Sequence, residues 1–148
     1  MDAYRDEAPL LAAFHKAFYD PDRKLFRDSD CSDHISLVGN SFAYGFDLCP
    51  DDACKRNTRK MIDEYGIDSL SFFCTFPILM RFAKDGESER LMAALLNEGA
   101  WRRMLREDAT TTFEGWGKDT KWNTSLFHLT MSYAAVFLAD VDLKKLFE

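Results

Sequence analysis

The sequence is poor in the residues that mark metal sites, disulfide frameworks and membrane segments. Its 148 residues include three histidines and four cysteines, and no two cysteines form a C-x-x-C pair. Zinc sites need such paired ligands, so we expect no metal and no other cofactor. Reduced thiols are typical of the cytoplasm, where we expect the protein to reside. No basic and then apolar leader follows Met1, and no apolar run could span a bilayer, so we predict no signal peptide and no membrane partner.

Lysine and arginine are also too few to suit a nucleic-acid-binding protein. They number 19 against 25 aspartates and glutamates, which gives a formal net charge of -6. Nucleic-acid-binding faces gather basic side chains. The one basic cluster, residues 55–60, is flanked by acids, so it is interpreted as a solvated helix face. We therefore expect no nucleic-acid partner.

What the chain has instead is apolar residues at helical spacing. Hydrophobic residues make up 47% of the sequence and aromatics 14%, and the length suits one folded domain over residues 1–148. Amphipathic or charged helices are predicted at about 7–19, at about 50–65 and after Ser88. Nearly uncharged helices are predicted between them, at about 35–46, 69–84 and 126–138. Alternating outer and inner helices are what an α/α hairpin array requires, so the predicted fold class is all-α.

Short polar residues before each apolar segment predict where these helices begin. The candidate caps are Ser32 or Asp33 for the second helix, Asp68 for the fourth, Ser88 for the fifth and residues 123–125 for the sixth. Gly66 is expected to end the third helix, because glycine accepts the backbone angles that follow a helix.

The stretch from Ala109 to His128 gathers a carboxylate, two tryptophans and a histidine between apolar segments. It reads ATTTFEGWGKDTKWNTSLFH. The β-branched run before Glu114 favours an extended backbone and Gly115 permits a turn, so Glu114 is expected where an extended run ends. His128 is expected in the first turn of the last helix. A carboxylate with aromatic faces beside it and a histidine on the next element fits sugar binding and acid–base chemistry.

These residues resemble motifs of the inverting α-L-rhamnosidases, glycoside hydrolases whose catalytic domain is a toroid of six helical hairpins. Residues 109–116 match the pattern A-T-T-x-W-E-x-W, with Phe113 in place of the first tryptophan. Residues 125–128 match an S-x-x-H helix start, and residues 34–40 match an H-x-S-L-x-x-N segment. The motifs occur in the family's order, so the resemblance covers nearly the whole chain.

The resemblance implies a carbohydrate substrate and assigns roles to five residues. Glu114 matches the general base, and the side chains implied to surround the sugar are His34, Asn40, Trp116 and His128. Three predicted hairpins amount to about half of an (α/α)6 toroid, the C-terminal part of the catalytic domain. In the family the general acid lies in the earlier half, which has no counterpart here. We therefore expect self-association or a complementary toroid half.

Two other interpretations stay open at this point. The chain could be a non-catalytic carbohydrate-binding or helical interaction module, in which Glu114, Trp116 and His128 only bind or cap. It could also be a purely structural array of hairpins. In either case Asn40 would be a core amide with its hydrogen bonds satisfied, and His128 would be bonded to backbone.

Overall fold

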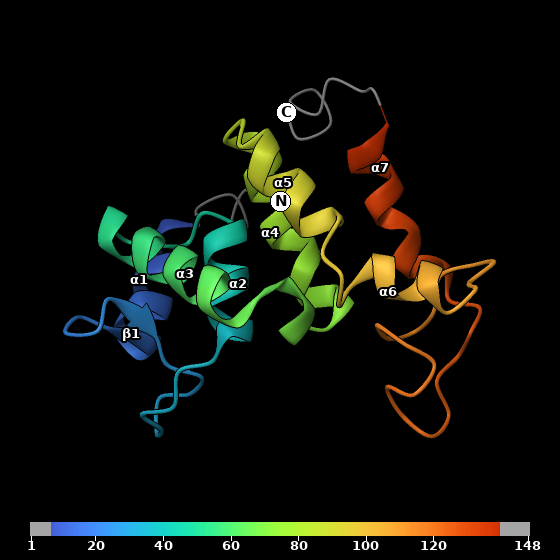
Figure 1. Ribbon diagram of the computed structural model, residues 1–148. Helices are drawn as coiled ribbons and strands as arrows, with labels where there is room; N and C mark the ends of the chain where they lie inside the picture. The colour runs from blue at the N-terminus through green and yellow to red at the C-terminus, as the bar shows by residue number, and fades with distance from the viewer. Residues whose placement is uncertain (1–6, 140–148) are drawn as a thin grey trace, which may run out of the picture. The chain divides into compact units, whose positions relative to one another are not determined.

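Helices dominate the computed structural model, which describes residues 7–139 apart from the side chain of Phe72 (Figure 1). Seven α-helices and one two-stranded antiparallel sheet are found among these residues, so the prediction of an all-α fold is confirmed. The chain divides into two compact units, residues 1–64 and residues 65–148. The single domain expected over residues 1–148 stays a prediction.

The first unit begins with helix α1 (Ala8–Phe18), which leads directly into a small hairpin of β1 (Tyr19–Asp20) and β2 (Leu25–Phe26). Tyr19 pairs with Phe26 across the hairpin. One oxygen of Asp20 accepts hydrogen bonds from the backbone N–H groups of residues 22 and 23, which closes the turn. The helix agrees with the predicted range of 7–19, whereas the hairpin was not predicted, because two-residue strands have no detectable periodicity.

Helix α2 (Leu37–Gly45) starts later than the sequence indicated, so the start predicted at Ile35 was wrong. Ser36 has an extended backbone, and its hydroxyl accepts a hydrogen bond from the Gly39 N–H at 3.2 Å. Ser36 is therefore the cap, in place of Ser32 or Asp33. As predicted for an uncharged helix, α2 is buried along most of its length.

Helix α3 (Asp52–Tyr65) follows with the predicted boundaries, capped by Asp51 and ended by Gly66 at a φ of 79°. The core of the first unit lies where α1, β2, α2 and α3 supply apolar side chains. Phe26 is at its centre, and its ring stacks on that of Phe14 with centroids 4.9 Å apart. The buried members are Phe26, Ala43 and Cys54, and the side chains packed on them are Phe14, Phe18, Tyr19, Leu48 and Cys49.

The second unit begins with a short 3₁₀ turn, η2 (Ile67–Ser69), followed by α4 (Phe72–Lys84) and α5 (Ser88–Leu95). The predicted start of α4 at Ser69 was wrong, because the Ser69 hydroxyl donates back to the Gly66 carbonyl at 2.8 Å and keeps this turn separate. The residue at the N-cap position of α4 is Ser71, whereas Asp68 was predicted there. Helices α4 and α5 pack side by side (Figure 1). Pro77 lies inside α4.

The rest of the second unit consists of α6 (Trp101–Arg106), a long loop, the 3₁₀ helix η3 (Leu129–Tyr133) and α7 (Ala134–Leu138). The last helix was predicted from Leu126, which was wrong, because helical structure begins with η3 at Leu129 and the α-helix begins only at Ala134. The expected caps instead bond within the loop: the Thr124 hydroxyl pairs with both backbone groups of Lys121, and the Ser125 hydroxyl donates to the Phe127 carbonyl. No helix among residues 7–139 has the length and apolar character to cross a membrane.

Candidate functional site

The loop between α6 and η3 carries Glu114 and His128 on two segments that are held together by backbone hydrogen bonds. The Glu114 N–H donates to the Ser125 carbonyl at 2.8 Å, and the His128 N–H donates to the Thr112 carbonyl at 2.7 Å. The Thr112 hydroxyl adds a bond to the His128 carbonyl at 2.6 Å. The predicted base and the predicted histidine therefore lie on facing segments of one loop. His128 precedes η3 and is not in a helical turn.

The Glu114 side chain is held at both of its oxygens and keeps 28% of its surface exposed. Oε1 accepts a hydrogen bond from the Lys121 ammonium at 2.6 Å, and Oε2 accepts one from the Ser125 N–H at 3.0 Å. The Lys121 ammonium, followed by the Ser125 N–H and with a contribution from His128, holds the pKa of Glu114 below its usual range. The carboxylate is therefore ionised at neutral pH.

Trp116 is buried, and its indole N–H donates to the Leu70 carbonyl at 2.6 Å. Its ring meets that of Trp101 edge-on, with centroids 4.8 Å apart. Trp101 in turn donates to the Met131 carbonyl at 3.0 Å and meets the Tyr133 ring edge-on. Trp116 thus supports Trp101 from behind, and Trp101 is the tryptophan that reaches a cavity.

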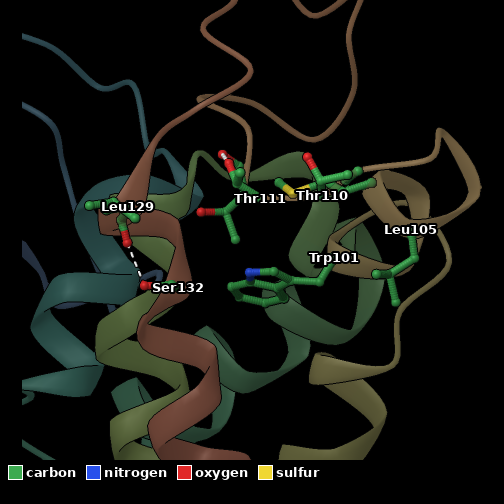
Figure 2. Close-up of a pocket in the computed structure, with 9 residues that line it drawn as sticks. Trp101, Leu105, Thr110, Thr111, Leu129 and Ser132 are labelled. Carbon is green, nitrogen blue, oxygen red and sulfur yellow. Dashed lines mark hydrogen bonds between the residues drawn. The ribbon is translucent and has the colours of Figure 1, made fainter.

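This cavity has a volume of about 360 Å³ and lies beside the loop. Figure 2 shows the Trp101 indole near its centre, with Thr110 and Thr111 above it in the view and the Leu129–Ser132 turn across from Leu105. The lining residues are Trp101, Met104, Leu105, Ala109, Thr110, Thr111, Thr112, Leu129 and Ser132. An apolar cavity of this size with a few hydroxyls suits a small organic ligand. No carboxylate is among the residues that line it.

His34 and Asn40 belong to the first unit, whereas Glu114, Trp116 and His128 belong to the second. His34 is exposed, and its Nδ1 lies 2.5 Å from Oδ2 of Asp28. The other oxygen of Asp28 accepts hydrogen bonds from the Ser36 hydroxyl at 2.7 Å and the Ser36 N–H at 3.2 Å. Burial acts to raise the pKa of Asp28, but the bonds from Ser36 and His34 outweigh it and lower that pKa.

The Asn40 side chain is fully buried, with all its bonds to the chain's own backbone. Its amide donates to the carbonyls of Phe26 and Ser36, both at 2.9 Å, and its oxygen accepts from the Phe26 N–H at 2.9 Å. These bonds fix β2 against α2. A cavity of about 430 Å³ lies next to this junction, lined by Phe14, Phe18, Phe26, Arg27, Asp28, Ser36, Val38 and Gly39.

Comparison with known families tests the resemblance on which the first interpretation rests. The family model of the bacterial alpha-L-rhamnosidase 6 hairpin glycosidase domain matches residues 1–140. The chain belongs to this family. No curated protein and no solved structure matches it. The predicted resemblance to rhamnosidase-type six-hairpin domains is thereby confirmed.

In this six-hairpin glycosidase domain, the sequence identified the loop that carries Glu114 and His128, but several contacts of the predicted site residues were not predicted. Lys121 and Ser125 were not predicted as partners of Glu114, although the glycines at 115 and 117 indicated a turn that could bring them back to it. Asp28 was not predicted as the partner of His34. Trp101, which lines the cavity, was not among the predicted site residues. Within residues 7–139, no three His, Cys, Asp or Glu side chains are grouped so that they could hold a metal ion.

Proposed function

We propose that this glycosidase domain carries the base side of an inverting glycoside hydrolase site that acts on α-L-rhamnosides, with Glu114 as the general base. One observation carries the proposal: Glu114 is a half-buried carboxylate kept ionised by Lys121 and Ser125, on the loop that borders the 360 Å³ cavity. The family match supports a glycosidase assignment. The motif around residues 109–116 supports rhamnose as the sugar.

In an inverting mechanism the base takes a proton from a water molecule as that water attacks the anomeric carbon. A second carboxyl group protonates the leaving oxygen, and the two groups lie roughly 6.5 to 9.5 Å apart in inverting enzymes. An ionised Glu114 can accept this proton through Oε1, once the Lys121 ammonium turns aside or shares the oxygen with water. The lowered pKa keeps the base competent in mildly acidic solution.

The remaining predicted site residues contribute to sugar binding in two ways. We propose that His34 binds sugar hydroxyl groups in the first unit, where its Nδ1 bonds to the Asp28 carboxylate. We propose the same role for His128 in the second unit, where it contributes to the lowered pKa of Glu114. We propose that Trp116 and Asn40 act through their neighbours. Trp116 supports the Trp101 face, on which a sugar ring can stack, and Asn40 positions the segments next to Asp28.

The stereochemistry of hydrolysis tests this proposal. The purified chain is incubated with an aryl α-L-rhamnoside, and the first product is followed by proton NMR before its anomers equilibrate. An inverting site releases the β-anomer first. Release of the α-anomer first would contradict an inverting general base at Glu114.

A second candidate is a non-catalytic carbohydrate-binding module. It is favoured by the two hydrogen bonds that already occupy both oxygens of Glu114, and by a cavity lining without a carboxylate that could serve as the acid. This candidate predicts that L-rhamnose binds in calorimetry without any turnover. Glu114→Gln would then keep its affinity for the sugar, whereas Trp101→Ala would lose it.

We also propose that the chain self-associates, so that a second copy or a complementary toroid half completes the site. Large apolar side chains are exposed in and around the loop between α6 and η3, and Trp122 is 96% exposed. The others are Leu105, Leu126, Phe127 and Leu129. Clusters of exposed apolar residues mark interaction surfaces. Light scattering should give a mass above that of one chain, and a strictly monomeric protein would contradict the proposal.

A further inference from the structure

The two thiols nearest the start of α3 form a close pair in the first unit. Cys54 lies in the first turn of α3 and is fully buried, and Cys49 lies half-buried in the connection that precedes this helix. The two sulfur atoms are 3.0 Å apart, and both thiols are reduced. This separation is only about 1 Å longer than a disulfide bond, so a small displacement would allow one to form.

The surroundings hold this pair in place. The Cys54 N–H donates to Oδ1 of Asp51 at 2.8 Å, and the Tyr19 hydroxyl donates to Oδ2 of the same carboxylate at 3.0 Å. Cys54 and Cys49 both pack in the core around Phe26. Because the helix start and the preceding connection are both fixed, the sulfur atoms stay close to each other.

We propose that Cys49 and Cys54 form a modification site, at which a low-molecular-weight disulfide such as glutathione disulfide oxidises the two thiols to an intramolecular disulfide bond. The other two cysteines have no such partner among their contacts in the described structure. Cys31 is exposed beside the Ser29 hydroxyl, and Cys74 is buried beside the Ser71 hydroxyl. The proposal does not depend on the glycosidase activity.

The reaction proceeds by two thiol–disulfide exchanges. Cys49 is the more accessible thiol; as a thiolate it attacks one sulfur of the oxidant, which forms a mixed disulfide and releases the first glutathione thiolate. Cys54 loses its proton to water and attacks the Cys49 sulfur, which releases the second. Each glutathione thiolate takes a proton from water. The protein loses two electrons and two protons, and the oxidant is reduced to two thiols.

The environment of Cys54 controls the second exchange. The hydrogen bond with Cys49 and then burial raise the pKa of the Cys54 thiol, with the Asp51 carboxylate acting in the same direction. Little thiolate is therefore present at Cys54 at neutral pH. We expect the mixed disulfide on Cys49 to form first, and its conversion to the internal disulfide to become faster as the pH rises.

The disulfide would tie the α2–α3 connection to the first turn of α3. The core that contains both sulfur atoms also contains Phe14, Phe18 and Phe26, whose rings line the 430 Å³ cavity. Oxidation would therefore constrain the packing behind the cavity that lies next to Asp28.

Mass spectrometry of the full chain tests the proposal. The protein is incubated with glutathione disulfide, remaining thiols are alkylated, and the peptides are mapped. We expect a mass about 2 Da lower than that of the reduced chain before alkylation, and a cross-link between Cys49 and Cys54. A chain that keeps all four thiols, or that carries glutathione only on Cys31, would overturn the proposal.

Two variants provide the matched controls. Cys54→Ser should accumulate the mixed disulfide on Cys49 without resolving it, whereas Cys74→Ser should form the internal disulfide as the unaltered chain does. Circular dichroism verifies that each variant is folded. The peptide map of the unaltered chain decides the question even if Cys54→Ser does not fold. An internal disulfide that still forms in Cys54→Ser would assign the reaction to another cysteine and contradict the proposal.

Discussion

At the scale of single residues, the ion pair with Lys121 is the main cause of the lowered pKa of Glu114. We predict that Lys121→Met raises the pKa of Glu114, because the ammonium is the main group that lowers it. A base must be deprotonated to act, so the acidic limb of the rate profile should move to higher pH. Carbon NMR of the labelled carboxyl group measures the same shift without any turnover.

The control for this prediction is Lys118→Met, which changes a second lysine of the same loop. The Lys118 backbone N–H donates to Glu107 at 2.7 Å, and Lys118 is not among the main groups that shift the pKa of Glu114. The pKa of Glu114 should therefore change little in this variant. An equal shift in both variants, or no shift in either, would show that Lys121 does not set the ionisation of Glu114.

A second prediction at this scale concerns the buried amide of Asn40. Asn40→Ala removes three hydrogen bonds and leaves the backbone N–H and carbonyl of Phe26 without partners in the core. We expect the free energy of unfolding to fall by about 3 kcal/mol in a urea titration. Asn57→Ala loses one bond at a more exposed position, so it should cost less than about 1 kcal/mol. Similar losses in the two variants would contradict the structural role of Asn40.

At the scale of elements, the periodicity of apolar residues predicted the helices well but the irregular segments poorly. The third helix was predicted with its range and its terminal glycine, because the signals for both are local. The last helix was predicted to begin at Leu126, whereas η3 begins at Leu129 and α7 at Ala134. There, backbone bonds from residues 112 and 114 to residues 125 and 128 compete with helix formation. Contacts between segments that are distant in the sequence cannot be predicted from the local periodicity of apolar residues.

The cap of α2 gives a prediction at the same scale. Ser36→Ala removes the hydroxyl that accepts from Gly39 and donates to Asp28, so the free energy of unfolding should fall by about 1 to 2 kcal/mol. Ser88→Ala should have little effect, because no side-chain capping bond is made at the start of α5. The ranking of the two losses in chemical unfolding tests the corrected cap, and the reverse ranking would contradict it.

At the scale of the whole molecule, several carboxylates bind protons less readily in the folded chain than their ordinary pKa values imply. Backbone N–H groups lower the pKa of Asp20, Asp51 and Glu107, and Lys121 lowers that of Glu114. A lowered folded pKa stabilises the fold above the ordinary carboxyl value of about 4, and this contribution is lost as the pH falls through the lowered values. Unfolding free energies should therefore be level near neutrality and decline below about pH 4. Constant stability down to pH 3, in urea titrations at a series of pH values, would contradict these shifts.

The sequence was sufficient to predict the family and the all-α fold, because motif order and helical periodicity extend over most of the chain. The site was predictable only in part. The motif was sufficient to select Glu114 and His128. The contacts of Lys121 with Glu114 and of Asp28 with His34 form only on folding, and the sequence did not specify either pair. Trp116 was expected to face a sugar, and its burial behind Trp101 follows from an indole bond to a distant carbonyl.

The most direct test of the account compares initial rates of aryl α-L-rhamnoside hydrolysis by the unaltered chain, Glu114→Gln and Glu89→Gln. The last variant is the matched control, an exposed glutamate in α5 of the same unit. With Glu114 as the general base, the unaltered chain and the control should turn over substrate, and Glu114→Gln should be slower by at least about 100-fold. Equal rates in all three proteins would contradict the proposed base, whereas no hydrolysis by the unaltered chain would contradict the proposal that self-association completes the site.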